Sequence, residues 1–209
     1  MRKAIIISCL IFSLAIFSSC LRTLYPIFLE DDVIFNESLI GYWNCTDSKG
    51  NDIGSYEFKP IPKAMRSELP AGIIKISDSG YLVTRNDSLG HEIGRNIVFL
   101  AKIGKNQYLD FYPVETPLQK TINKHFRDHY IKVHTSYRCD VKNTNYFELR
   151  EFDYGFLEGL IANNQINMTL SGNKLIESTT QELQEYILRY GDNPKAYGSA
   201  TKCSRVVNY

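Results

Sequence analysis

The side chains best suited to ligand binding lie in one short predicted strand, Gln107 to Tyr112. Successive side chains of a strand point to opposite faces, so Asp110 shares a face with Tyr108 and Tyr112. If this face is interior, an acid between two aromatic rings could orient a ligand, and the tyrosine hydroxyls could bond to it. If the face is exterior, it is a solvated edge, and we favour such a structural use of these residues.

Three histidines, His125, His129 and His134, lie close together in the sequence. Because His129 and His134 are five residues apart, they would face opposite sides of one strand, so a shared metal site is not expected. The chain contains no G-x-S-x-G, H-E-x-x-H or P-loop pattern. We therefore assign no catalytic residue, metal or cofactor, and we favour a non-enzymatic role.

The first residues have the features of an export signal. Arg2 and Lys3 precede an almost wholly apolar segment, Ala4 to Phe17. This segment is short for a membrane span, which needs about 20 apolar residues, and is typical of a signal peptide. It ends in Phe17-Ser18-Ser19-Cys20, which resembles the lipobox of bacterial lipoproteins, where two small residues precede an invariant cysteine. Phe17 departs from the family pattern, which prefers leucine there.

The lipobox resemblance implies that residues 1–19 are removed and that Cys20 becomes the lipid-anchored N-terminus. A diacylglyceryl group with a further acyl chain, such as palmitate, exceeds what stable membrane attachment requires. The expected location is the cell envelope, on its periplasmic or outer-surface side. The alternative is an ordinary signal peptide in which Cys20 is incidental.

The composition of the mature chain narrows the class of protein. Removing 19 of 209 residues leaves 190, which fits one domain, and removing Arg2 and Lys3 leaves 22 basic and 23 acidic residues. No basic stripe is present, so a nucleic-acid partner is not expected. We assign residues 20–37 to a tether and residues 38–209 to a single domain.

Three cysteines remain once Cys9 leaves with the signal peptide and Cys20 carries lipid: Cys45, Cys139 and Cys203. They allow one disulfide and one free thiol in an oxidising compartment. If the first and last strands are neighbours in a closed sheet, Cys45 pairs with Cys203. Zinc binding by the three is less favoured, because they lack the close spacing of structural zinc sites.

Short β-branched and aromatic segments separated by turn residues predict a mainly β fold. Two helices are predicted late in the chain, Tyr154 to Asn163 capped by Asp153, and Thr179 to Tyr190 with a capping box. A long loop or flap is predicted over residues 113–128. The predicted strands are Leu39–Thr46, Ser55–Lys59, Gly72–Ser77, Tyr81–Arg85, Asn96–Ile103, Gln107–Tyr112, His129–Thr135, Tyr146–Phe152 and Cys203–Val207. Closing such strands into an antiparallel β-barrel would hide their edges.

Gly41, Trp43 and Arg205 carry a second resemblance. In lipocalins and their relatives, a G-x-W on the first strand places tryptophan at the barrel floor, and an arginine of the last strand stacks across it. The resemblance implies a lipocalin-like barrel with these three residues in structural roles. The run Phe99 to Pro113 also looks like a segment of uncharacterised bacterial lipoproteins, which brings no activity with it.

Two functions of different classes follow from this sequence. The first is a lipid-anchored, non-enzymatic binding module that holds a small apolar or amphipathic ligand in the barrel mouth, with Tyr108, Asp110 and Tyr112 as candidate contacts. The alternative is a structural or interaction lipoprotein with a filled barrel that docks on another envelope protein. A cavity of several hundred Å³ favours the first function, and a packed interior favours the second.

The lipid assignment predicts the behaviour of Cys20→Ala. This variant lacks the thiol that accepts the diacylglyceryl group, so it should leave the membrane fraction and incorporate no labelled fatty acid. Cys139→Ala is the control, and it should fractionate as the unmodified chain does. Unchanged membrane fractionation and labelling of Cys20→Ala would rule out the anchor.

Overall fold

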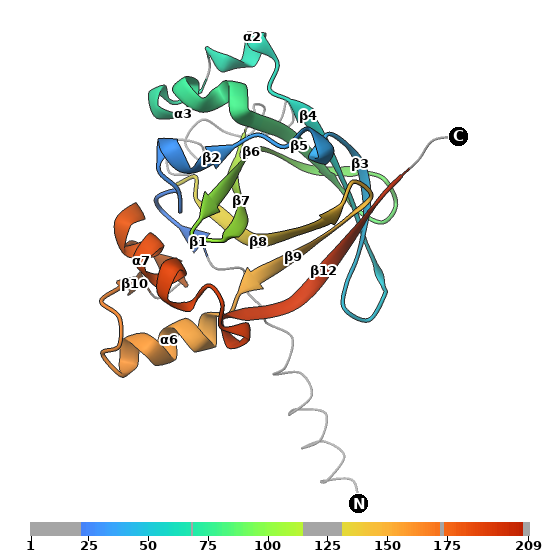
Figure 1. Cartoon of the computed structure of the whole chain (residues 1–209). Coiled ribbons are helices and arrows are strands. Elements are labelled where there is room, and N and C mark those ends of the chain that lie inside the picture. The colour runs from blue at the N-terminus through green and yellow to red at the C-terminus, as the bar shows by residue number, and fades with distance from the viewer. Residues whose placement is uncertain (1–21, 68, 115–130, 172–173, 207–209) are drawn as a thin grey trace, which may run out of the picture.

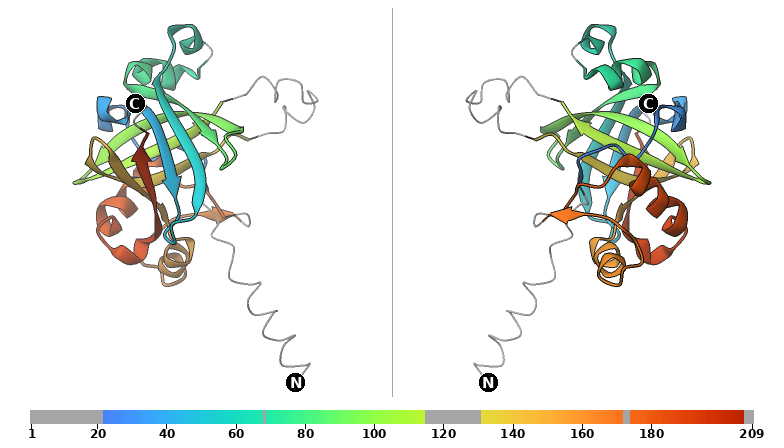
Figure 2. Two further views of the ribbon diagram at one scale, coloured as in Figure 1. Left: turned by 90° about the vertical axis from the view of Figure 1, so that its right-hand side faces the viewer. Right: turned by 90° about the vertical axis from the view of Figure 1, so that its left-hand side faces the viewer.

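The computed structural model describes residues 22–67, 69–114, 131–171 and 174–206. Eight of its strands form a closed antiparallel β-barrel, in which each strand pairs with the next and the last pairs with the first (Figures 1 and 2). The predicted mainly β, barrel-forming fold class is therefore confirmed. The barrel strands are β3 (Gly41–Thr46), β4 (Asp52–Pro60), β5 (Gly80–Asn86), β6 (Glu92–Ile103), β7 (Asn106–Pro113), β8 (His134–Asn143), β9 (Tyr146–Phe152) and β12 (Tyr197–Arg205).

The barrel closes between β12 and β3. Cys203 lies directly opposite Cys45 in this pairing, and the two form a disulfide with a Cα–Cα distance of 4.2 Å. The bridge joins residues 158 positions apart, and in the chain-entropy model a loop of that size is worth about 5 kcal/mol. Cys139 is free and buried. The pairing predicted from a closed sheet is thus present.

The interior of the barrel is packed with large side chains. One cluster of buried residues receives members from all eight barrel strands, which identifies it as the interior. The ring of Phe147 lies 4.6 Å from that of Trp43 and 6.2 Å from that of Phe58, which in turn lies 5.8 Å from Tyr81, measured between centroids. These four aromatic side chains are at most 1% exposed.

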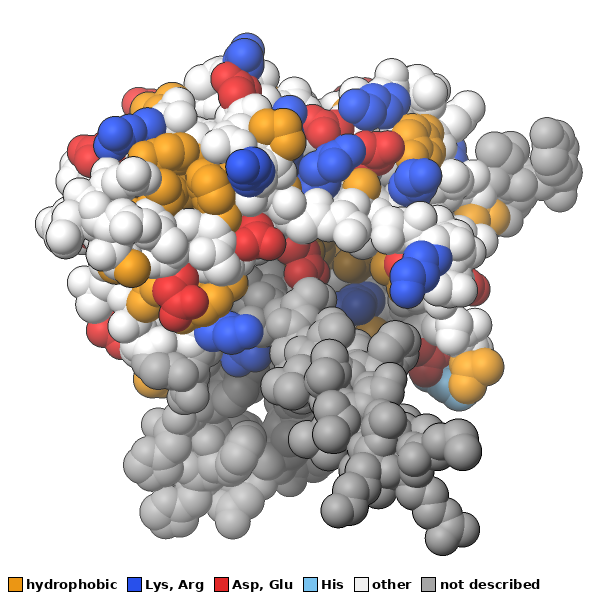
Figure 3. Space-filling view, turned by 90° about the horizontal axis from the view of Figure 1, so that it is seen from below, with side chains coloured by type: hydrophobic (Ala, Val, Ile, Leu, Met, Phe, Trp, Pro, Cys, Tyr) orange, Lys and Arg blue, Asp and Glu red, His pale blue; other side chains and the backbone are white. Residues whose placement is uncertain are grey.

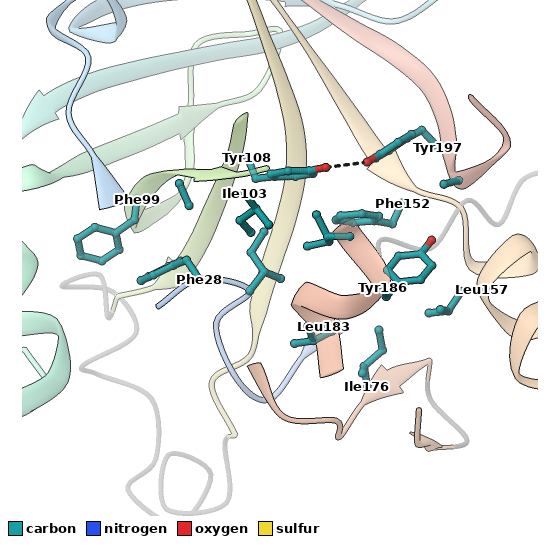
Figure 4. Close-up of a cluster of buried hydrophobic side chains, with 14 of the residues drawn as sticks. Phe28, Phe99, Ile103, Tyr108, Phe152, Leu157, Ile176, Leu183, Tyr186 and Tyr197 are labelled. Carbon is teal, nitrogen blue, oxygen red and sulfur yellow. Dashed lines mark hydrogen bonds between the residues drawn. The ribbon is translucent and has the colours of Figure 1, made fainter. Parts of the chain in front are cut away.

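A second buried cluster lies outside the barrel wall (Figure 4). It joins the outward side chains of β6, such as Phe99, to helices α6 (Tyr154–Ala162) and α7 (Thr180–Tyr190). Both helices were predicted, with their caps: Asp153 accepts a hydrogen bond from the Phe156 amide, and Thr179 and Glu182 form a capping box. Their apolar stripes cover the outer wall, so this part of the molecule has two layers.

Residues 22–37 pack on the domain, so the tether prediction is wrong for this described part of 20–37. Ile27 and Phe28 are 1% and 6% exposed and belong to the outer cluster. The segment lacks a periodic apolar pattern because it crosses the barrel as short pieces rather than as one long element. The pieces are β1 (Arg22–Thr23), η2 (Glu30–Asp32), β2 (Val33–Ile34) and η3 (Glu37–Leu39).

The segment predicted as the strand Gly72–Ser77 is helical. It contains α3 (Ala71–Ile76) followed by η4 (Ser77–Ser79), and α2 (Lys63–Arg66) precedes it. The isoleucines of this run suggested a strand, but Ile73 and Ile76 pack against the outer cluster from the same short helix. Tertiary packing here overrides the β-preference of branched side chains.

β8 runs from His134 to Asn143, whereas the prediction placed a strand at His129–Thr135. Residues 131–133 are not in a strand, and residues 129–130 lie outside the described part of the chain, as does most of the predicted 113–128 loop. β12 likewise begins at Tyr197, earlier than predicted. The remaining described elements are β10 (Leu170–Ser171), β11 (Leu175–Ile176) and η5 (Pro194–Ala196).

Arg205 closes the barrel floor beneath Trp43. Its guanidinium carbon lies 4.3 Å from the centroid of the Trp43 ring, and its nitrogens donate to the carbonyls of Ser38, Ile40 and Thr144. Gly41 has a φ of +134°, and a Cβ there would collide with this guanidinium. The three residues of the lipocalin resemblance therefore form one structural unit, with Gly41 leaving room for Arg205.

Arg205→Ala should lower the free energy of unfolding by about 2–3 kcal/mol, because it removes a cation–π contact and three carbonyl partners. Urea unfolding followed by the fluorescence of Trp43, the single tryptophan, measures this change. Lys202→Ala on the exposed side of the same strand is the control, and it should shift stability by less than about 0.5 kcal/mol. Equal stability of the two variants would contradict the proposed role of Arg205 in closure.

Candidate functional site

Tyr108, Asp110 and Tyr112 lie on the outer face of β7, because Leu109 and Phe111 of the same strand fill the interior. This outer face is nevertheless covered: Tyr108 and Asp110 are 0% exposed. The N-terminal segment and α7 lie over it, as the shared outer cluster shows. Tyr108 and Asp110 thus sit neither in the barrel mouth nor on a solvated edge, and Tyr112 is half-buried near the end of the strand.

Asp110 is the centre of a buried polar group beneath the N-terminal segment. His134 Nδ1 lies 2.6 Å from its Oδ1, and Ser136 Oγ donates to its Oδ2 at 2.7 Å. The amide of Ile27 also donates to Oδ2, at 3.4 Å. A buried carboxylate is stable only when its lone pairs are satisfied, and here β8 and the N-terminal segment satisfy them together.

The chemistry open to this group is limited by its hydrogen bonds. An acid–histidine pair can act as a general base when the histidine contacts a nucleophile. Here the Ser136 hydroxyl donates to Asp110 rather than to His134, and the His134 ring packs on Tyr112 with centroids 5.0 Å apart. We therefore interpret this hydrogen-bonded group as structural: it helps to hold residues 22–28 on the barrel.

A second polar group fastens the end of α7. The hydroxyls of Tyr108 and Tyr197 lie 3.0 Å apart (Figure 4), and Tyr197 donates to the carbonyl of Gly191 at 3.2 Å. Arg138 donates to the same carbonyl at 2.8 Å. Desolvation by burial, followed by the neighbouring Tyr197, raises the pKa of Tyr108 well above its usual range. Burial also raises the pKa of Tyr197, so both hydroxyls are neutral at neutral pH, while Arg138 brings a positive charge to the Gly191 carbonyl.

His134 and Ser136 were not assigned to the Asp110 site from the sequence. The signal was available, because Tyr137, Cys139 and Val141 alternate with polar residues after His134 and indicate a strand with one apolar face. On that strand His134 and Ser136 share a face. Only the β7–β8 register, which pairs Asp110 with Ser136, shows that this face meets the acid.

A groove lies on the outside of the molecule, between α7 and residues 165–168. It has a volume of about 430 Å³, within the range of ligand and peptide sites. Its wall is mixed, with apolar Ile166 and Met168 facing the charged Glu185 and Arg189. Arg189 donates to the carbonyl of Gln165 at 2.9 Å and so fixes one rim. A second void, beside Ile27, measures only about 10 Å³.

The described residues form no metal site, and the face seen from below carries no field of one sign. Within residues 22–206, leaving aside the undescribed stretches, no three His, Cys, Asp or Glu side chains are grouped to hold a metal ion. In the same described ranges, no helix has both the length and the apolarity needed to cross a membrane. Figure 3 shows acidic, basic and apolar side chains intermingled on the face seen from below.

Comparisons with family models, with curated proteins and with solved structures each found no match to this chain.

Asp110→Ala should loosen the N-terminal segment and lower the free energy of unfolding by about 2–3 kcal/mol, because His134, Ser136 and the Ile27 amide lose their acceptor. Hydrogen exchange at residues 22–28 should accelerate more than exchange in the interior strands. Asp140→Ala is the control, since Asp140 makes partly exposed ion pairs with Arg138 and Arg150. Unchanged exchange at residues 22–28 in Asp110→Ala would contradict the fastening role.

Proposed function

We propose that this chain is a cell-envelope lipoprotein, anchored through Cys20, whose packed barrel serves as a scaffold that docks on another envelope protein. The observation that carries this choice is the filled interior, where Trp43, Phe58, Tyr81 and Phe147 occupy the space that a lipocalin would offer to a ligand. A barrel packed in this way presents its outer surface for function. The resemblance of Phe17–Cys20 to a lipobox supports the lipid anchor, and the anchor in turn supports the envelope location.

The groove beside α7 is the surface best formed for docking. It is held in shape by the α7 capping box at one end and by the Arg189–Gln165 hydrogen bond at the other. Ile166 and Met168 offer apolar contact, and Glu185 and Arg189 offer charges of both signs at the rim. An apolar centre with a polar rim is the usual anatomy of a protein interface.

A small apolar or amphipathic ligand is the second candidate, and the groove volume of about 430 Å³ favours it. This ligand would bind outside the barrel, beside α7, rather than at Tyr108, Asp110 and Tyr112. Those residues already hydrogen-bond or stack within the structure.

A brominated fatty acid distinguishes a ligand in the barrel from one in the groove, because bromine quenches only a nearby tryptophan. Wild-type protein should show no saturable quenching, since the single tryptophan, Trp43, is surrounded by packed side chains. Ile166→Trp in a Trp43→Phe background reports on the groove instead. Saturable one-to-one quenching of Trp43 would contradict the filled-barrel proposal, and saturable quenching at position 166 alone would favour the second candidate.

Protein docking is tested by a photoreactive amino acid placed at Glu185, with Lys202 as the matched exposed control on β12. In intact cells the Glu185 position should yield one discrete cross-linked envelope protein, and the Lys202 position should not. Arg189→Glu should remove that adduct, because it reverses the charge at the groove rim. Identical adducts from both positions would contradict docking through the groove.

A further inference from the structure

The N-terminal segment constrains how the domain stands on a membrane. One residue, Leu21, lies between Cys20 and Arg22, so the Cα atoms of Cys20 and Arg22 are at most about 7 Å apart. Arg22 and Thr23 form β1, which is paired on one side with β8 and on the other with β11. A lipid on Cys20 would therefore hold the start of β1 close to the membrane surface, because the intervening chain is too short to act as a spacer.

β1 is held firmly in this position. Thr23 is 2% exposed, and the amide of Leu24 donates to the carbonyl of Ile176 at 3.0 Å. Further along, Thr180 of α7 donates to the carbonyl of Pro26 at 2.8 Å, and Asp110 accepts from Ile27. Lifting the domain off the membrane by unpeeling these residues would break all of these contacts.

The surface around β1 has the chemistry of a membrane interface. Tyr25 and Ile131 are 49% and 67% exposed, although both are large and apolar or aromatic. The paired segments of β1, β8 and β11 are accompanied by three basic side chains, each within three residues of a pairing position: Arg22, Lys132 and Lys174. One exposed acid, Glu177, directly follows β11. Tyrosine, aliphatic and basic side chains together are favoured where a protein meets lipid headgroups.

We propose that the surface formed by Arg22, Tyr25, Ile131, Lys132 and Lys174 seats the domain directly on the headgroups of the lipid bilayer. This inference rests on the proposed anchor at Cys20 and adds an orientation to it. Lys132 and Lys174 lie over the rings of Tyr112 and Tyr154, at 5.9 Å and 5.0 Å, so their charges are held at this surface. In the seated state the far end of β8 points away from the bilayer.

The matched control, Lys142, lies near the end of β8 that is far from β1. Lys142 is exposed and is eight residues beyond His134 along β8, a distance of about 26 Å in an extended strand. Tyr25→Cys, Ile131→Cys and Lys142→Cys each accept one environment-sensitive fluorophore. Burial raises the pKa of the Cys139 thiol, which keeps this thiol from competing for the label.

The lipidated full-length protein is placed in vesicles of phosphatidylethanolamine and phosphatidylglycerol, and each label is quenched by a lipid-borne nitroxide or by aqueous iodide. Labels at positions 25 and 131 should be quenched by the nitroxide at least threefold more than the label at 142, with the reverse order for iodide. Equal quenching at all three positions would overturn the seating.

Mass spectrometry of the N-terminal peptide separates the two proposals. If Cys20 carries its acyl chains and the three labels behave alike, the anchor stands and the seating is wrong. If Cys20 carries no lipid, the anchor is wrong and the seating falls with it.

Discussion

The closure of the barrel between its first and last strands is the constraint on which the rest of the structure depends. An open sheet of this size would leave two edges of unpaired backbone groups, whereas the β12–β3 pairing satisfies them. The Cys45–Cys203 disulfide secures the same pairing covalently, and Arg205 secures it from the floor by covering Trp43. A disulfide, backbone hydrogen bonds and a cation–π contact thus all stabilise the pairing of β3 with β12.

Closure also decides where function can reside. A closed barrel of eight strands has room for either its own side chains or one small ligand. In this chain large aromatic residues fill the space, so binding moves to the outer layer built by α6, α7 and the N-terminal segment. The groove beside α7 and the surface around β1 both belong to that layer. Because the layer is fastened through Asp110 and Tyr108, its geometry is coupled to the barrel wall.

The polar groups at Asp110 and Tyr108 illustrate how buried polar residues specify a unique arrangement. An acid with no exposure needs partners, and its partners come from β8 and from the amide of Ile27. The bonds from His134 and Ser136 are made within the barrel wall, and the bond from the Ile27 amide forms only when the N-terminal segment lies in its observed position. A segment with little periodic apolar pattern is therefore ordered by two buried side chains, Ile27 and Phe28, together with a few hydrogen bonds.

Local patterns in the sequence determined the strands with regular alternation, both late helices with their caps, and the pairing of Cys45 with Cys203 once closure was assumed. The strands and helices depend on residues close together in the sequence, and the disulfide depends only on the pairing of the first strand with the last. Tertiary structure alone decided that Gly72–Ser77 is helical, that residues 22–37 pack on the barrel, and that Tyr108 and Asp110 face outward beneath a second layer. The alternation on β7 showed which residues share a face, but both faces of this strand are buried. Which buried face is the interior depends on the strands and helices that cover it, and these come from distant parts of the chain.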